Sequence, residues 1–268
     1  MFGRRKVLTP CELRINRVSL TLEQRLFATY YQKITNLSHM DPRNRDDNKM
    51  EAHGLELLNR PLPSDNFSST EQFYAFVAAH GKSSEVDVFT MKLGFQRWIQ
   101  QQQSRSTHQL VLPIFVNVHL STLFSEQWNA FISHFPADPT LVVLELSERE
   151  GLDTYTKEDV SKTIRQLKDM GFKIAVDDLG MAYSGLYTLA VVHPDYVKID
   201  RQLVNRIDED EYRQYMMGSL LEYWRREGVA VIAEGIEREE EANFFLANGA
   251  TYAQGYWFHR PVQVESPK

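Results

Sequence analysis

Two adjacent acids, Asp177 and Asp178, are the clearest sign of chemistry in this sequence. They end the stretch KIAVDDLG, whose apolar residues 174–176 indicate a short buried strand. The preceding segment SKTIRQLKDMG predicts an amphipathic helix that ends at Gly171. In parallel α/β sheets and barrels, ligands bind at the carboxyl ends of the strands. A pair of acids at that place attracts a hard divalent cation, although a solvated turn that caps the next helix has the same pattern.

Polar residues also end other apolar stretches of the chain. These stretches are LVLPIFVNVHL, LVVLELSE, DYVKID, VAVIAEGIE and TYAQGYWF. The carboxyl ends of parallel strands meet at one mouth of a barrel, so we expect these polar side chains to converge, although each alone has an ordinary structural explanation. With the acid pair, the set comprises Asn117, Glu145 with Glu148, Asp177 with Asp178, Lys198, Glu234 with Glu237, and Gln254.

These residue types favour Mg²⁺ or Mn²⁺ over zinc. Asn, Asp and Glu supply only oxygen ligands, and the sequence has one cysteine and no HExxH pair. Clustered acids repel one another unless cations neutralise them, and two metal ions about 3.5–4 Å apart are typical of enzymes that hydrolyse phosphate esters. Lys198 beside the metals could orient a water or offset charge on a phosphate. The residues therefore predict a metal-dependent phosphoester hydrolase without defining its substrate.

Strand-like and helix-like segments alternate along the chain, most regularly after residue 110. This alternation predicts parallel strands joined by right-handed crossovers. About eight strand candidates in a chain of this length fit a (β/α)8 barrel. A doubly wound open sheet is the competing architecture, and the lack of a GxGxxG turn counts against its dinucleotide-binding version.

The N-terminal part is less regular. Residues 1–20 are basic and are expected to form an arm or a first packing strand, outside a single barrel domain of residues 21–268. A short helix is expected from Thr21 to Phe27, followed by a strand in ATYYQKITNL. Residues 38–49 form a polar loop, and GLELLNRPL is a strand whose Glu56 faces away from its leucine neighbours.

Composition limits the class of protein. The chain has 268 residues, 43% hydrophobic and 25% charged, as in soluble globular proteins. A net charge of -6 argues against a broad surface for DNA or anionic membranes. The single Cys11 excludes an internal disulfide framework, and no apolar run reaches the ~20 residues of a membrane span. These features predict a cytoplasmic protein.

Beyond these patterns, the sequence is similar to the EAL-domain family of cyclic di-GMP phosphodiesterases from about Tyr30 to Pro261. The strongest matches are ELSE at 145–148, DDLG at 177–180, VKID at 197–200, AEGIE at 233–237 and QGYWF at 254–258. Upstream, YYQKI resembles the family's first strand, and FVNVHLS resembles the strand that ends in a metal-binding asparagine. The naming motif appears as Glu56-Leu57-Leu58, with leucine in place of alanine, and Arg60 fits the pattern that follows.

The resemblance implies a modified TIM-like (β/α)8 barrel with one strand antiparallel, which hydrolyses cyclic di-GMP to linear pGpG and commonly forms a homodimer. It implies metal ligation by Glu56, Asn117, Glu145, Asp177 and Asp178, with Asp177 and Asp178 serving the second of two metal sites. The implied catalytic residues are Asp178, Lys198, which would position the water, and Glu234, the general-base candidate. The residues implied to contact the nucleotide are Gln32, Arg60 and Gln254, with Glu148 and Glu237 in supporting roles.

Several departures from the family pattern bear on activity. The family usually has glycine at Ala182 and serine at Gly185, and alanine disfavours a positive φ. The 38–49 loop is longer than usual and, like the N-terminal arm, could bind a protein partner. An active phosphodiesterase is the leading hypothesis. A non-catalytic cyclic di-GMP receptor or protein-binding regulator is the second, and hydrolysis of another phosphodiester is the third.

Overall fold

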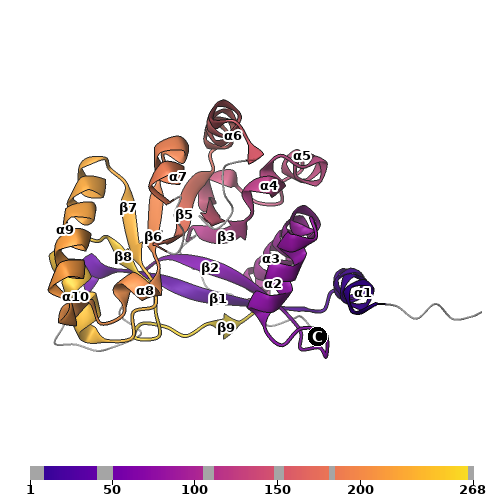
Figure 1. Cartoon of the computed structure of the whole chain (residues 1–268), viewed down its shortest axis with the longest axis horizontal. Coiled ribbons are helices and arrows are strands. Elements are labelled where there is room, and N and C mark those ends of the chain that lie inside the picture. Colours follow the sequence, from indigo (N-terminus) through magenta and orange to yellow (C-terminus); the bar gives the residue numbers. More distant parts are fainter. Residues whose placement is uncertain (1–8, 41–50, 105–111, 148–153, 181–184, 265–268) are drawn as a thin grey trace, which may run out of the picture.

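A closed β-barrel with helices around it forms the body of the molecule (Figure 1). The computed structural model describes residues 9–40, 51–104, 112–147, 154–180 and 185–264. The strands are β1 (Phe27–Asn36), β2 (Ala52–Pro61), β3 (Ile114–Val118), β4 (Val142–Ser147), β5 (Lys173–Leu179), β6 (Tyr196–Ile199), β7 (Ala230–Ala233), β8 (Tyr252–Ala253) and β9 (Val262–Gln263).

The strand order confirms the predicted barrel with one reversed strand. Strands β2 to β8 follow one another in parallel, and β1 closes the sheet by pairing antiparallel with both β8 and β2. The short β9 adds to β1 in antiparallel register. The closure excludes the open doubly wound sheet that was the competing architecture.

The helices of the described part cover the outside of this barrel (Figure 1). They are α1 (Pro10–Glu23), α2 (Thr70–Ala79), α3 (Ser83–Ser104), α4 (Leu120–Leu123), α5 (Glu126–Ile132), α6 (Lys157–Asp169), α7 (Gly185–Val192), α8 (Arg201–Val204), α9 (Glu211–Arg226) and α10 (Glu239–Ala247). Short 3-10 turns occupy Leu37–His39, Pro139–Leu141 and Ile207–Glu209. Helix α6 is typical, because Val160, Ile164 and Leu167 recur at helical spacing and are all buried.

The N-terminal segment differs from the sequence-based expectation. In its described part, residues 1–20 contain no strand, and helix α1 already begins at Pro10 and runs across position 20. Thr9 caps this helix and forms a capping box with Glu12, and proline suits the first helical turn. The helix expected from Thr21 to Phe27 is therefore wrong, since α1 ends at Glu23 and β1 begins at Phe27.

An apolar layer fills the inside of the barrel. Its buried members, each from a different strand, are Ile34, Phe115, Val143, Ala175 and Ile232, with Tyr196 and Tyr252 packed against them. Larger clusters lie between the strands and the helices. Leu57, which replaces the family's alanine, is 3% exposed and belongs to one of these outer clusters. Its side chain therefore points away from that of its neighbour Glu56 and into helix packing.

Candidate active site

The predicted polar residues form a second layer inside the barrel, next to the apolar one. Residues two apart on a strand face the same side, so each polar residue shares the inward direction of an apolar-layer residue two positions away. The pairs are Gln32 with Ile34, Asn117 with Phe115, Glu145 with Val143, Asp177 with Ala175, Lys198 with Tyr196, Glu234 with Ile232, and Gln254 with Tyr252. The alternation of the strands thus brings residues more than 200 positions apart into one site.

Lys198 lies at the centre of the polar layer and is 1% exposed. Its Nζ atom is 2.7 Å from Glu145 Oε1, 2.9 Å from Glu234 Oε1 and 3.2 Å from Asp177 Oδ1. A fourth carboxylate, that of Glu56, lies 3.7 Å away. One ammonium group therefore faces four carboxylates, which leaves the site with an excess of negative charge.

This imbalance alters the acidity of the site. Burial by itself would lower the pKa of Lys198, but the surrounding carboxylates, Asp177 and Glu145 foremost, raise it well above its ordinary value. Burial raises the pKa of Glu145 and of Glu234 well above the ordinary carboxyl value, and Lys198 only partly offsets this effect. Further positive charge nearby would favour the ionised forms of Glu145 and Glu234, so the site suits a divalent cation.

Asp177 and Asp178 both reach the same site although they are neighbours on β5. Neighbouring strand residues normally face opposite sides. Here Asp178 has a φ of 57°, and the pairing of β5 with β6 shifts register between Val176 and Leu179. As a result, Asp177, Asp178 and Glu234 each place a carboxylate oxygen within 4.8 Å of the others. These three acids are candidate ligands for a cation that binds oxygen donors.

Two amide side chains extend the site on either side of Glu56. Asn117 Nδ2 donates hydrogen bonds to Glu56 Oε1 (3.1 Å) and Glu145 Oε2 (3.0 Å). Gln254 Nε2 donates to Glu56 Oε2 (2.6 Å) and to Gln32 Oε1 (3.1 Å). The antiparallel register of β1 and β2 places Gln32 directly opposite Glu56. Gln254 Oε1 is buried and accepts no hydrogen bond from any described residue, so it could accept one from a ligand.

Three other predicted site residues lie apart from this cluster or outside the described residues. Arg60 is exposed on β2, with its guanidinium 5.1 Å from the ring centre of Tyr30. Glu237 is exposed and forms an ion pair with Arg201 at 3.0 Å. Glu148 lies outside the described residues, as do Ala182 and most of the 38–49 loop.

The sequence-based reasoning missed Asp87 on α3. This carboxylate is 4% exposed and accepts hydrogen bonds from the backbone N–H of His119 (2.8 Å) and from Thr122 Oγ1 (2.6 Å). Its Oδ2 also lies 3.0 Å from His119 Nδ1. Asp87 thus holds the turn that follows Asn117. Its one signal in the sequence is an acid between Val86 and Val88, both of which are buried.

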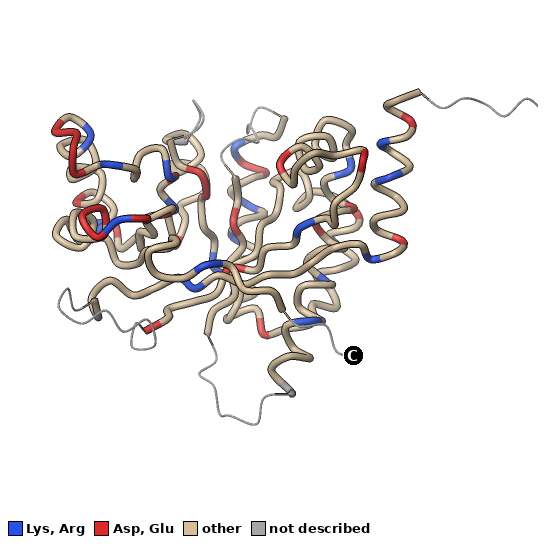
Figure 2. Tube along the Cα trace, turned by 90° about the horizontal axis from the view of Figure 1, so that it is seen from below, with Lys and Arg blue, Asp and Glu red and all other residues tan. Residues whose placement is uncertain are grey.

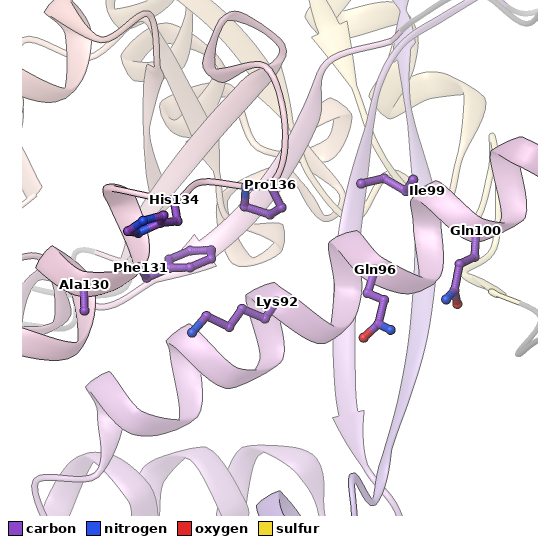
Figure 3. A pocket seen from close by; sticks show the side chains of 8 residues that line it. All are labelled: Lys92, Gln96, Ile99, Gln100, Ala130, Phe131, His134 and Pro136. Atoms are coloured by element: carbon purple, nitrogen blue, oxygen red, sulfur yellow. The ribbon is translucent and has the colours of Figure 1, made fainter.

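A surface pocket of about 410 Å³ lies between α3 and α5 (Figure 3). Lys92, Gln96, Phe131 and His134 are among its lining residues, and Lys92 lies 5.2 Å from the ring centre of Phe131. None of the strand-end carboxylates lines this pocket. The polar layer inside the barrel is therefore the better candidate for catalysis, because acids, amides and the buried ammonium of Lys198 converge there.

The fold and the site together define a barrel protein with a cluster of acids whose oxygens could hold a cation. The chain belongs to the EAL domain family, whose sequence model matches residues 15–261. It is 34% identical over 143 residues to the probable cyclic di-GMP phosphodiesterase PdeG of Escherichia coli K12, an alignment that covers 53% of this chain and 28% of PdeG. The chain thus matches less than a third of that relative's length.

Two solved structures show the same fold. The EAL enzyme Bd1971 in its cAMP- and cyclic di-GMP-bound form superposes with a TM-score of 0.79 at 24% identity, covering 98% of this chain and 69% of Bd1971. The manganese and cyclic di-GMP complex of BlrP1 from Klebsiella pneumoniae gives a TM-score of 0.65 at 23% identity, covering 89% of this chain and 56% of BlrP1.

Proposed function

We propose that this chain is a metal-dependent phosphodiesterase that hydrolyses cyclic di-GMP to linear pGpG. The observation that carries the proposal is the single buried ammonium of Lys198 among four carboxylates in the mouth of the barrel. Family membership and the cyclic di-GMP named for related proteins support the choice of substrate.

The donor set fits two divalent cations, Mg²⁺ or Mn²⁺. Glu56, Asn117, Glu145 and Asp177 would hold one, and Asp177 with Asp178 would hold the other, beside Glu234. When bound, such ions neutralise charge on the phosphate and lower the pKa of the attacking water. All of these donors are oxygens, and the excess negative charge around Lys198 supports the assignment.

The chain's own residues would then perform the following steps. Lys198, held by three carboxylates at 2.7–3.2 Å, would orient the attacking water. Glu234, whose Oε1 lies 2.9 Å from Lys198 Nζ, would accept the proton of that water. The water oxygen bonds to phosphorus while the P–O3′ bond breaks and the 3′ oxygen gains a proton. One phosphodiester is opened, which leaves a 5′-phosphate and a 3′-hydroxyl.

Nucleotide binding is assigned to Gln32, Gln254 and Arg60. The unpaired Oε1 of Gln254 would accept a hydrogen bond from a guanine N–H group. Arg60 lies four residues beyond Glu56 on the same face of β2, so its exposed guanidinium could reach a phosphate or a guanine edge outside the acid cluster.

The test is incubation of the purified chain with cyclic di-GMP and Mg²⁺ or Mn²⁺, with and without EDTA, followed by chromatography of the products. We expect conversion to pGpG that EDTA and Asp177→Asn abolish. Asp169→Asn, at an exposed position of α6, is the matched control and should retain activity.

A cyclic di-GMP receptor is the second candidate, favoured by Ala182 and Gly185 in the segment after the acid pair. Under that alternative, the wild-type chain leaves the substrate intact but still binds it in a titration. If the chain neither hydrolyses nor binds cyclic di-GMP, both functions are contradicted.

A further inference from the structure

The surface pocket between α3 and α5 has the size and the lining of a small-molecule site (Figure 3). Its volume of about 410 Å³ lies in the range of ligand pockets, which runs from about 300 to 1,000 Å³. Lys92, Gln96 and Ile99 line it from one face of α3, since residues three and four apart are neighbours on a helix. Phe131 of α5 and Pro136 line the other side. We call this site the α3–α5 pocket.

The apolar wall of the α3–α5 pocket belongs to a packed aromatic cluster. The ring centre of Phe135 lies 5.3 Å from that of Phe95, 5.3 Å from that of Phe131 and 5.0 Å from that of Phe172. Phe95, Phe131 and Phe172 are only 1–3% exposed. Rings packed in this way cannot move into the pocket without leaving a void behind them. The pocket is therefore preformed, which lowers the cost of binding a ligand there.

The α3 side of the pocket offers positive charge and a hydrogen-bond donor. Lys92 carries an ammonium group 5.2 Å from the ring centre of Phe131. Gln96 Oε1 accepts a hydrogen bond from Arg25 Nη2 at 2.6 Å, which leaves the Nε2 group of Gln96 to donate. None of the residues that line the pocket in the described part of the chain is acidic. In a chain with a net charge of -6, this lining favours an anionic ligand.

His134 lines the same pocket and adapts to the ligand. Ser133 Oγ donates a hydrogen bond to the carbonyl oxygen of Ala130 at 3.0 Å, so the same hydroxyl accepts the N–H of His134 Nδ1 at 2.9 Å. The other ring nitrogen of His134, Nε2, then accepts in the neutral imidazole and donates in the protonated one. Lys92 is therefore the fixed positive charge of the lining, and a change at Lys92 tests the charge of the ligand.

We propose that the α3–α5 pocket binds a small organic monoanion, a carboxylate on a flat apolar body. The apolar body would lie against Ile99, Phe131 and Pro136, and the carboxylate would lie between Lys92 Nζ and Gln96 Nε2. One fixed ammonium matches one negative charge, whereas a phosphate monoester would bring nearly two. The pocket contains no residue of the polar layer, so the proposal goes beyond the proposed phosphodiesterase and does not depend on it.

Calorimetric titration of the full chain with cinnamate and with cinnamamide tests the charge of the ligand. The two probes share a flat apolar body, but only cinnamate is charged. EDTA is present in every titration, so that no divalent cation holds the carboxylate at the acid cluster. We expect cinnamate to bind the wild type at least about fivefold more tightly than cinnamamide, the value of one partly exposed ion pair.

Lys92→Met removes the charge and keeps the apolar stem of the side chain, so this variant should bind the two probes equally. Lys162→Met, at an exposed position within α6, is the matched control and should keep the preference for cinnamate.

A second pair of variants tests the place of binding. Ala130→Trp puts an indole into the pocket from an exposed position of α5, so neither probe should bind. Asn129→Trp, at the preceding exposed position, which does not line the pocket, is the control and should bind both probes as the wild type does. Circular dichroism checks that both variants fold.

Any of four results would overturn the proposal. They are no saturable binding of cinnamate to the wild type, equal wild-type affinities for the two probes, an unchanged preference in Lys92→Met, and unchanged binding in Ala130→Trp. Turnover of cyclic di-GMP enters none of these measurements, so failure of the proposed phosphodiesterase and failure of this site are separate results.

Discussion

Lys198 balances much of the charge in the polar layer, and its removal tests that balance directly. Lys198→Met keeps the length of the side chain but leaves four buried or partly buried carboxylates without their ammonium partner. Removing one partner of a buried ion pair costs about 3–5 kcal/mol, so we expect a loss of this size in the metal-free free energy of unfolding. Chemical denaturation in EDTA measures it, and added Mn²⁺ should restore part of the loss. Lys173→Met, at a 54% exposed side chain, is the control, and equal losses in both variants would contradict the interpretation.

The raised pKa values of Glu145 and Glu234 predict a dependence of stability on pH. Above the ordinary carboxyl pKa of 4.5, the unfolded chain releases protons that the metal-free folded state still binds. The free energy of unfolding that these groups contribute therefore falls as the pH rises from 4.5 toward the raised pKa values. We expect Glu234→Gln to show a shallower fall than the wild type in EDTA. Because metal ligands must be ionised, Mn²⁺ should stabilise the wild type more at about pH 8 than at about pH 5.5. Identical pH profiles for the two proteins would count against this account.

The convergence of the acids, Lys198 and Gln254 could be predicted from the sequence. Each stands at the end of an apolar strand, and the carboxyl ends of parallel strands meet at one mouth of a barrel. The contacts of Gln32 with Gln254 and of Asp87 with His119 could not be derived from the pattern. Each joins elements whose relative position only the closed barrel defines. The roles assigned to all of these residues, and to Glu148 and Glu237, stay predictions.

At the scale of elements, the ends of β7 and β8 are tied together close to the site. The backbone N–H of Gln254 donates to the carbonyl oxygen of Ala233 (2.8 Å), and the backbone N–H of Ile236 donates to the carbonyl oxygen of Gln254 (3.1 Å). A Cβ atom at Gly255 would overlap the backbone N and O atoms of Ile236, which cannot move away as a side-chain end could. The close approach of these two segments therefore requires glycine.

Gly255→Ala should force these segments apart and displace Gln254 and Glu234 together. We expect a loss of at least about 1–3 kcal/mol in the free energy of unfolding, with weaker Mn²⁺ binding. Gly81→Ala is the control, because a Cβ atom there meets nothing within 4 Å and only the positive φ of 63° is unfavourable. Denaturation curves and calorimetric Mn²⁺ titrations of both variants measure the difference. Wild-type Mn²⁺ affinity in Gly255→Ala would show that the two segments do not position the ligands.

The order of elements after residue 110 was predictable because each apolar run is short and bounded by helical patterns. The helix boundaries were less predictable where more than one residue could act as the N-cap. Ser125 caps α5 and so divides the stretch TLFSEQWNAFISHF between α4 and α5. Asp210 caps α9, so this helix begins at Glu211. Any Ser, Thr, Asp or Asn near the start of a helix can accept hydrogen bonds from its free backbone N–H groups. Hydrophobic periodicity alone therefore does not reveal which of these residues is the N-cap.

At the scale of the whole molecule, acidic residues outnumber basic ones, 36 to 30. Figure 2 shows acidic and basic residues interspersed along the outer helices, with a net charge of -6 for the whole chain. None of the helices in the described part combines the length and the apolar character that crossing a bilayer requires. A net negative charge disfavours a broad surface for DNA, which is itself a polyanion.

The division into an N-terminal arm of residues 1–20 and a barrel domain of residues 21–268 can be tested by deletion. Helix α1 crosses this boundary, and its Val18 is 2% exposed in a cluster with Leu22, Phe27 and Phe73. Deleting residues 1–20 removes Val18 and all but the last turn of α1. We expect the remaining barrel to fold and to keep its cation site, because no residue of the polar layer lies before Gln32.

The truncated chain should nevertheless be less stable by at least about 1.5–3 kcal/mol, the value of burying one apolar side chain of this kind. Thermal and chemical denaturation, with circular dichroism as the readout, measure this loss. Val18→Asp in the full chain should reproduce most of it, whereas Leu13→Asp, at a 47% exposed position of the same helix, should not. A truncated chain that fails to fold would move the domain boundary toward the amino end. Unchanged stability would show that α1 contributes nothing to the barrel, and either result would refute this account of the N-terminal segment.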